Sequence, residues 1–293
     1  MNIYDCFMYF DEDMLLDIRM NILNKYVKKF IIVESKFLHS GKPKKLNFNL
    51  NNFAKFKDKI EYIVMEDPPS GIENISKEDS ENEKNRKILD NSLKRENSQR
   101  NQLWEGIKKI HDEELIFSSD LDEIPNIKNF KYKNKINIFL QKVFYYKFNL
   151  QQPDFTWHGT RACKKKDLLS FQWLRNIKGK KYPLWRLDCL FSKKKYFNVN
   201  FIKDGGWHFT SIKSPEKIFY KLSNFMHHLE FELSGLKVKN MQDLVNQKKI
   251  LYDHNVDQKK EKYKSEIYLN KVDEKALPIY LQENKEKFIK WLD

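Results

Sequence analysis

Cysteine and long apolar runs are scarce in this chain. The 293 residues include only three cysteines, Cys6, Cys163 and Cys189, and their wide spacing fits neither a disulfide framework nor a zinc site. No apolar run approaches the roughly 18 residues that a membrane-spanning helix requires. The first residues also lack the basic and apolar regions of a signal peptide. We therefore expect a protein of the reducing cytoplasm.

Several familiar catalytic motifs are missing as well. The sequence has no Walker loop, no dinucleotide-binding glycine pattern and no nucleophile elbow around a serine. What it does have is a hydrophobic fraction of 40%, which is enough to bury a sizeable core. The chain is therefore long and apolar enough for one large globular domain, whose chemistry has to come from other residues.

Positive charge is in excess, with a net charge of +14. A basic protein can bind nucleic acid, an anionic membrane surface or phosphorylated substrates. Lysines cluster at residues 164–166, 178–181 and 193–195, where they either face phosphate or lipid headgroups or form solvated loops. No basic helix carries interleaved groove-reading residues, so we expect no nucleic-acid partner. A peripheral contact with the anionic inner face of a membrane stays open.

The first 125 residues alternate between short apolar runs and helical periodicity. Buried strands are predicted at residues 3–8, 30–33, 60–65 and 115–117. A helix opening at Asp11, a short helix at residues 53–59 and a helix from about residue 93 would connect these strands. Strands that alternate with helices predict an α/β fold with a parallel sheet.

Three later stretches depart from this alternation. Residues 70–91 are polar and predict a mobile or solvated insertion that is partly helical. Residues 136–150 are strongly aromatic and predict a helix that continues into a strand. From Ser214 the pattern is helical, and an amphipathic helix over residues 278–292 closes the chain.

Acidic residues follow three of the four predicted strands. Glu34 follows the second strand, Asp67 the third, and the acidic motif Asp120-Leu121-Asp122 the fourth. The carboxyl ends of parallel strands meet at one edge, where open α/β sheets bind their ligands. Crowded carboxylates repel each other, so a divalent cation, Mg²⁺ or Mn²⁺, would stabilise them. The alternative for the motif is a solvated turn or a helix cap.

Two further residues are candidates for the same edge. His208 follows Gly205, Gly206 and Trp207, and the Trp207 ring offers a flat face for stacking on a sugar. His208 is either a nitrogen ligand of the cation or a core histidine whose ring nitrogens are satisfied. Arg100 interrupts the apolar face of its helix, so it is either solvated or placed to bind a diphosphate in bidentate fashion.

Several segments together resemble glycosyltransferase family 17, which contains the β-1,4-mannosyl-glycoprotein 4-β-N-acetylglucosaminyltransferases and bacterial and viral relatives. The most specific segments are Ser119-Asp120-Leu121-Asp122-Glu123-Ile124-Pro125 and Gly206-Trp207-His208-Phe209. The others follow in family order: Tyr4-Asp5-Cys6-Phe7 with Asp11-Glu12, Val33-Glu34-Ser35 with Gly41-Lys42-Pro43, Asp67-Pro68-Pro69, Arg95-Glu96-Asn97 with Gln99-Arg100-Asn101, Pro215-Glu216 with Lys221-Leu222, and Leu277-Pro278 with Tyr280-Leu281 and Asn284.

The resemblance covers almost the whole chain outside residues 70–91. It implies a GT-A-type fold in one domain over residues 1–293, with a mostly parallel central sheet flanked by helices and a helical C-terminal part. Residues 1–125 would bind a nucleotide sugar and residues 126–293 the acceptor. The family implies UDP-N-acetylglucosamine as donor, a divalent metal and inversion at the anomeric carbon. Since the membrane anchor of animal members is missing, we expect a bacterial or viral glycan, or a lipid-linked glycan, as acceptor.

The resemblance also assigns roles to single residues. Asp122 would be the chief metal ligand, His208 a second one, and Asp120 would contact the metal or the donor. Residues with donor-binding roles would be Phe7, Glu34, Asp67, Arg100, Asp120 and Trp207.

The catalytic base should be an acid that reaches the acceptor. We expect Asp204, which precedes the two glycines near His208, with Asp154 and Asp188 as alternatives.

Two other functions remain open from the sequence. A metal-dependent phosphodiesterase or nuclease would use the same acids, but it would need two metal ions and more converging carboxylates. A basic nucleic-acid-binding protein would explain the charge, but the aromatic residues are spread through core patterns and no basic groove-reading helix stands out.

Overall fold

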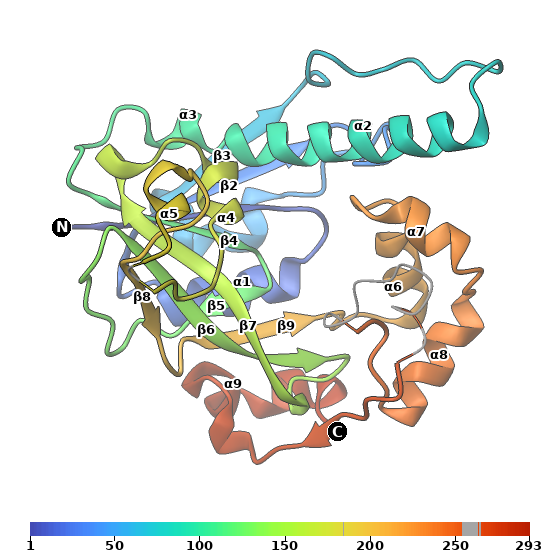
Figure 1. The fold of residues 1–293 in the computed structure, drawn as a ribbon. Helices are drawn as coiled ribbons and strands as arrows, with labels where there is room; N and C mark the ends of the chain where they lie inside the picture. The colour runs from blue at the N-terminus through green and yellow to red at the C-terminus, as the bar shows by residue number, and fades with distance from the viewer. Residues whose placement is uncertain (184, 254–262, 264) are drawn as a thin grey trace.

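A computed structural model describes residues 1–183, 185–253, 263 and 265–293. Its centre is one sheet in the order β3-β2-β1-β4-β7-β6-β9-β5, with β10 paired to β7 and β8 paired to β6. Helices flank this sheet (Figure 1). The predicted α/β class is confirmed.

The N-terminal part of the sheet is parallel. Its strands are β1 (Ile3–Met8), β2 (Val27–Ser35), β3 (Ile60–Met65) and β4 (Leu115–Asp120). The connections contain α1 (Asp13–Leu23), the 3₁₀ segment η1 (Leu50–Lys59), α2 (Glu81–Asn101) and α3 (Trp104–Ile107). Met8 pairs with Val33 on one side and with Asp120 on the other. These strands therefore end at one edge of the sheet, as the sequence predicts.

The remaining strands extend this sheet with mixed direction. They are β5 (Glu123–Pro125), β6 (Ile136–Tyr145), β7 (Leu150–Lys164), β8 (Val199–Ile202), β9 (Gly206–Thr210) and β10 (Asn270–Lys271). The prediction that residues 136–150 begin as a helix is wrong, because the segment is a strand from Ile136. Most of its side chains are buried on both faces of the sheet, which produces a continuous apolar run without alternation.

Short helices make up most of the remaining chain. They are η2 (Lys165–Asp167), α4 (Phe171–Asn176), α5 (Asp188–Phe191), α6 (Pro215–Leu222), α7 (His228–Leu233), α8 (Val238–Gln247), η3 (Glu274–Ala276), α9 (Ile279–Glu283) and η4 (Lys285–Trp291). The predicted closing helix is thus two short ones, α9 and η4. Figure 1 shows α6, α7 and α8 gathered at one end of the sheet.

The predicted insertion is only partly irregular, because α2 already begins at Glu81. A capping box starts the helix: the Ser80 hydroxyl accepts from the Glu83 amide at 3.3 Å, and the Glu83 carboxylate accepts from the Ser80 amide at 3.1 Å. Ion pairs, such as Arg86 with Glu73 at 3.0 Å, hold the helix to the preceding loop. Because polar contacts hold this part of α2, its sequence lacks the apolar periodicity from which a helix is predicted.

Side chains alternate between two cores on the two faces of the sheet. Phe7, Ile32 and Phe117 face the core that includes α1 and α9. Cys6, Val33 and Ile116 face the core that includes α3 and α4. All three cysteines are free and buried. No helix in the described ranges has the length and apolar character needed to cross a membrane.

A buried arginine of α1 ties the sheet to the acidic motif. Arg19 and Asp5 are both fully buried, and the guanidinium donates to the two carboxylate oxygens at 2.7 and 2.6 Å. Its remaining donors reach the carbonyl oxygens of Leu121 at 3.1 Å and Glu123 at 2.7 Å, and the Ser119 hydroxyl at 2.9 Å. One side chain thus fixes the backbone that carries the acidic motif.

Replacement of Arg19 should destabilise the whole domain. We expect Arg19→Met to reduce the free energy of unfolding by about 3–5 kcal/mol, because Asp5 would stay buried without its counter-ion. Urea unfolding at neutral pH measures this change. Lys28→Met removes an exposed charge from β2 and should cost no more than about 0.5 kcal/mol. Equal effects of the two substitutions would contradict the assigned role of Arg19.

Candidate active site

A pocket with a cavity volume of about 310 Å³ lies where β1, β2 and β4 end. Met8, Ser35 and Asp120, the last residues of these strands, line it. The charged side chains of its wall are Glu12, Lys44, Glu96, Arg100, Asp120, Asp122, Lys213 and Lys221, with His39 and His208 beside them. This is the edge at which the sequence predicts the ligand.

Asp122 and His208 face each other in this pocket. His208 lies on β9, where it pairs with Glu123 of β5, and this register brings the imidazole next to the acidic motif. The His208 Nε2 atom lies 3.6 Å from the Asp122 Oδ1 atom, which is too long for a direct hydrogen bond. Each residue is only 8% exposed.

The surroundings of Asp122 and His208 leave both side chains incompletely paired. His208 Nδ1 has no hydrogen-bond partner within the described residues, so His208 differs from the satisfied core histidine of the alternative interpretation. Burial raises the pKa of Asp122 above its ordinary value, although Lys221 and His208 oppose this effect. The carboxylate of Asp122 is therefore a buried charge that its neighbours balance incompletely.

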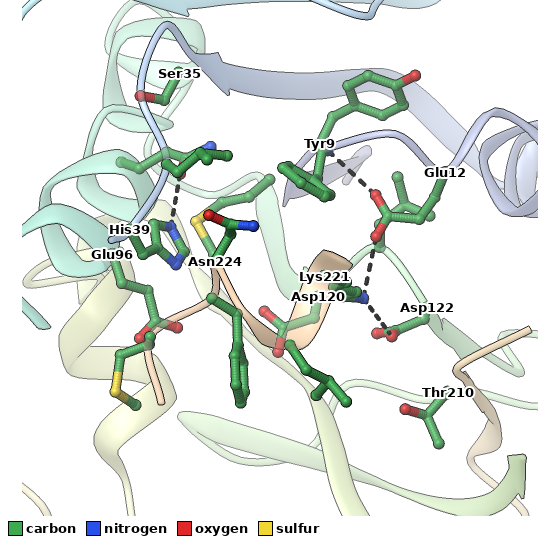
Figure 2. Close-up of a pocket in the computed structure, with 18 of the residues that line it drawn as sticks. Tyr9, Glu12, Ser35, His39, Glu96, Asp120, Asp122, Thr210, Lys221 and Asn224 are labelled. Atoms are coloured by element: carbon green, nitrogen blue, oxygen red, sulfur yellow. Dashed lines mark hydrogen bonds and ion pairs between the residues drawn. The ribbon is translucent and has the colours of Figure 1, made fainter. Parts of the chain in front are cut away.

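Lys221 of α6 lies between two carboxylates of the pocket (Figure 2). Its ammonium group is 3.1 Å from Glu12 and 3.7 Å from Asp122, while Lys213 lies 3.4 Å from Glu12. Burial would raise the pKa of Glu12, but Lys213 and Lys221 outweigh it and hold this pKa well below its usual range. Burial would likewise lower the pKa of Lys221, but Glu12 and Asp122 raise it instead. Glu12 and Lys221 are therefore both charged at neutral pH.

Asp120 is held by two arginines. Arg100 donates to one carboxylate oxygen at 3.0 Å and Arg175 of α4 to the other at 3.1 Å. Arg175 also binds both oxygens of Glu123 at 2.7 Å. Burial alone would raise the pKa of Asp120, but Arg175 and Arg100 outweigh it and lower this pKa strongly. Asp120 therefore anchors the motif, whereas the Asp122 carboxylate meets no arginine among these contacts.

The structure thus brings together four of the predicted site residues: Arg100, Asp120, Asp122 and His208. It also reveals Glu12, Lys213, Lys221 and Arg175, to which the sequence interpretation gave no role. The sequence points only to Glu12 and Lys221, which lie in the segments that resemble the family. Nothing in the sequence shows that the four residues, far apart along the chain, lie close together in the fold.

Three other predicted residues point away from the pocket because side chains alternate along a strand. Phe7 is adjacent to Met8 on β1, and its ring lies in the opposite core, 4.6 Å from the Arg19 guanidinium. Glu34 is adjacent to Ser35 on β2, and Trp207 is adjacent to His208 on β9. The wall of the pocket includes Ser35 and His208 but neither Glu34 nor Trp207. Direct donor contact by these three side chains therefore has no support in their positions.

Glu34 and Trp207 instead have structural partners. Glu34 is fully buried and accepts from the amides of Asn47 at 2.7 Å and Phe48 at 3.0 Å, and from the Tyr62 hydroxyl at 2.8 Å. It thereby fixes the loop after β2, which supplies part of the pocket wall. Trp207 donates to the Ala276 carbonyl at 2.7 Å.

A different tryptophan lines the pocket. The Trp157 ring centroid is 4.9 Å from that of His208, with 31° between the ring planes. Its Nε1 atom donates to Glu123 at 2.6 Å. Trp157 therefore offers the aromatic face in the pocket that the sequence suggested for Trp207.

The remaining predicted acids are outside the pocket wall. Asp67 is exposed after the edge strand β3, and Asp204 is exposed in the turn before β9, with φ of 47°. Of the alternatives for the base, Asp154 is exposed, and Asp188 accepts from Arg186 at 2.8 and 3.0 Å. The structure therefore gives no support to these acids as groups that touch a ligand in this pocket.

The buried charge of Asp122 predicts a gain in stability when it is removed. Because its folded-state pKa is raised, ionisation of this carboxyl group costs stability at neutral pH, and this cost disappears as the pH falls and the group becomes protonated. Asp122→Asn should therefore raise the melting temperature at pH 7 in the presence of a chelator, and the gain should shrink in acid.

Asp204→Asn is the matched control, since Asp204 is exposed and asparagine also tolerates its left-handed backbone conformation. Thermal unfolding at several pH values compares the two variants. A lower melting temperature of Asp122→Asn at pH 7 would refute the assigned burial cost.

Comparison with known proteins identifies the family of the chain. Residues 1–175 match the model of glycosyltransferase family 17. No curated protein matches the chain. The matched region includes the acidic motif, Arg19, Arg100 and Arg175, and the α/β sheet with its flanking helices is consistent with a glycosyltransferase fold. Because the match covers more than half of the sequence, the chain belongs to glycosyltransferase family 17.

Proposed function

We propose that this glycosyltransferase transfers N-acetylglucosamine from UDP-N-acetylglucosamine to a hydroxyl group of a glycan or lipid-linked glycan. It would use Mn²⁺ or Mg²⁺ and invert the anomeric carbon. The observation that carries the proposal is the pair Asp122 and His208, which face each other at 3.6 Å at the carboxyl edge of the sheet. The choice of donor sugar and the inversion rest on the family resemblance. The free, buried cysteines support a cytoplasmic location.

The donor atoms of Asp122 and His208 fit a divalent cation. A carboxylate oxygen and an imidazole nitrogen suit Mn²⁺, and one or two protein carboxylates with substrate phosphates suffice for Mg²⁺. Within the described residues no group of three or more Asp, Glu, His and Cys side chains gathers as a metal cluster. The Asp122–His208 pair therefore supports a cation that is shared with the donor diphosphate rather than one that is enclosed by protein. When bound, the cation would neutralise charge that develops on the leaving diphosphate.

The lysines of the pocket supply further positive charge. Lys221 contacts Glu12 and Asp122 at once, so it holds Asp122 toward the pocket while it keeps its own proton. Arg100 lines the same pocket and is fixed by Glu96 at 2.9 Å and Gln172 at 2.7 Å. These fixed cations would stabilise a diphosphate without rearrangement during the reaction.

The acceptor hydroxyl needs a base. Asp204 lies outside the pocket wall, and Glu12 and Asp120 bind protons weakly because neighbouring cations lower their pKa values. Glu96 is the remaining acid of the wall that the proposed cation site does not use. Among the ion pairs of the described residues Glu96 meets one cation, Arg100 at 2.9 Å, whereas Glu12 and Asp120 each meet two. Figure 2 shows Glu96 beside His39 at one end of the pocket, with Asp122 at the other end and Asp120 between them. We therefore favour Glu96 over Asp204 as base.

A donor assay tests the proposed function. The wild-type protein with UDP-N-acetylglucosamine and Mn²⁺ should release UDP, and Asp122→Ala should lower this rate at least about a hundredfold while the fold is retained. Glu96→Gln should lower the turnover strongly, whereas Asp204→Asn should remain close to wild type. Equal activity of wild type and Asp122→Ala would refute the site, and loss of activity in Asp204→Asn alone would restore Asp204 as base.

A further inference from the structure

Large apolar side chains are exposed together around α5. Trp185 is 79% exposed, Leu187 66%, Leu190 65% and Phe191 89%. Cys189, in the middle of α5, is buried, so one side of the helix faces the protein. Four large apolar residues within seven positions are exposed to solvent. Contiguous exposed apolar surface of this kind usually marks an interaction site.

The same surface is bordered by two lysine-rich stretches. The Lys178 amide donates to the Lys194 carbonyl at 2.7 Å, and this bond brings both stretches together at the base of α5. The Trp173 indole donates to the Lys193 carbonyl at 2.7 Å and fixes the second stretch to α4. Exposed lysines of the pair of stretches are Lys178, Lys180, Lys181, Lys193 and Lys194. The chain folds so that two lysine-rich stretches separated in sequence meet beside α5.

The charge of this surface is almost entirely positive. Residues 178–195 contain seven lysines and arginines and a single acid, Asp188, which gives a net charge of +6. Arg186 contacts this acid at 2.8 Å and Lys195 does so at 2.7 Å. The local excess therefore remains available to an external anion.

The third lysine-rich stretch behaves differently. Lys164 lies 2.6 Å from Glu113 and Lys165 lies 3.2 Å from Asp112, and Lys166 also pairs with Glu113. Residues 164–166 therefore form ion pairs within the protein rather than facing lipid or phosphate. Beside Lys166 the exposed apolar side chain is Leu169, whereas the two stretches beside α5 border four such side chains.

We propose that the α5 surface, formed by Trp185, Leu187, Leu190 and Phe191 with the bordering lysines, docks on an anionic lipid membrane. Apolar and tryptophan side chains enter the boundary between headgroups and acyl chains, and lysines bind the negative headgroups. Charge complementarity selects this partner, because exposed apolar side chains flanked by positive charge match a surface that is anionic outside and apolar beneath. The proposal rests on the proposed function in one respect: it places the transferase where a lipid-linked acceptor would be. Only three positions separate Lys178 of this surface from Arg175 of the active site.

Vesicle sedimentation tests the proposal with the full chain. Vesicles of phosphatidylcholine alone are compared with vesicles that contain equal amounts of phosphatidylcholine and phosphatidylglycerol. We expect at least about tenfold more bound protein on the anionic vesicles, and a decline of this binding as salt is added. Equal binding to both vesicles, or binding to neither, would overturn the proposal.

Variants distinguish binding through the α5 surface from non-specific adsorption to the vesicles. The double substitution Trp185→Ser and Phe191→Ser should reduce binding at least about tenfold, as should the triple substitution Lys178→Gln, Lys180→Gln and Lys181→Gln. Leu233→Ser is the control, because Leu233 is 70% exposed on α7, away from α5 (Figure 1). This variant should bind the vesicles as the wild-type protein does. Wild-type binding by the double variant would overturn the proposal.

Two further readouts distinguish the remaining outcomes. Conversion of a wild-type dimer into a monomer by the double variant, without vesicle binding in either, would show that the α5 surface joins two copies of this chain. Vesicle binding requires neither donor nor metal, while UDP release is measured without vesicles. The membrane proposal and the proposed transferase function can therefore fail independently.

Discussion

The ion pair between Arg19 and Asp5 is the constraint on which the site depends. It lies wholly inside the protein, where its two charges are matched by each other and by backbone carbonyls of the segment after β4. A buried arginine without these partners would be very unfavourable, so the segment has to keep its conformation. Arg100 and Arg175 then hold Asp120 from the other side of the sheet edge. Between these fixed points the Asp122 carboxylate is directed into the pocket.

The same arrangement links stability to function. Most charged side chains of the site are paired: Glu12 with two lysines, Asp120 with two arginines and Glu123 with Arg175. Asp122 is balanced less completely, because Lys221 and His208 lie 3.7 and 3.6 Å from it and burial still raises its pKa. A carboxylate that its own protein stabilises incompletely is suited to bind an external cation. The other ion pairs of the site offset the free energy that it costs to bury the Asp122 carboxylate.

Much of the fold follows from local sequence patterns, and much of the site does not. β3 and β4 begin at the residues where their apolar runs begin, and the acids after β4 lie at the predicted edge. The prediction treated every acid near a strand end as part of the site, but alternation along the strand decides which face it points to. Glu34 thus faces the opposite side from Ser35. Arg19, Arg175 and Lys221 could not be assigned, since their partners lie about a hundred, fifty-five and two hundred positions away.

The central claim is that Asp122 and His208 together hold the cation that binds the donor. Crystals grown with UDP and Mn²⁺, with anomalous diffraction measured for manganese, test it most directly. We predict one manganese ion at about 2 Å from both Asp122 Oδ1 and His208 Nε2, with the diphosphate oxygens on its open side. An ion that contacts neither residue, with UDP bound in the same pocket, would contradict the account.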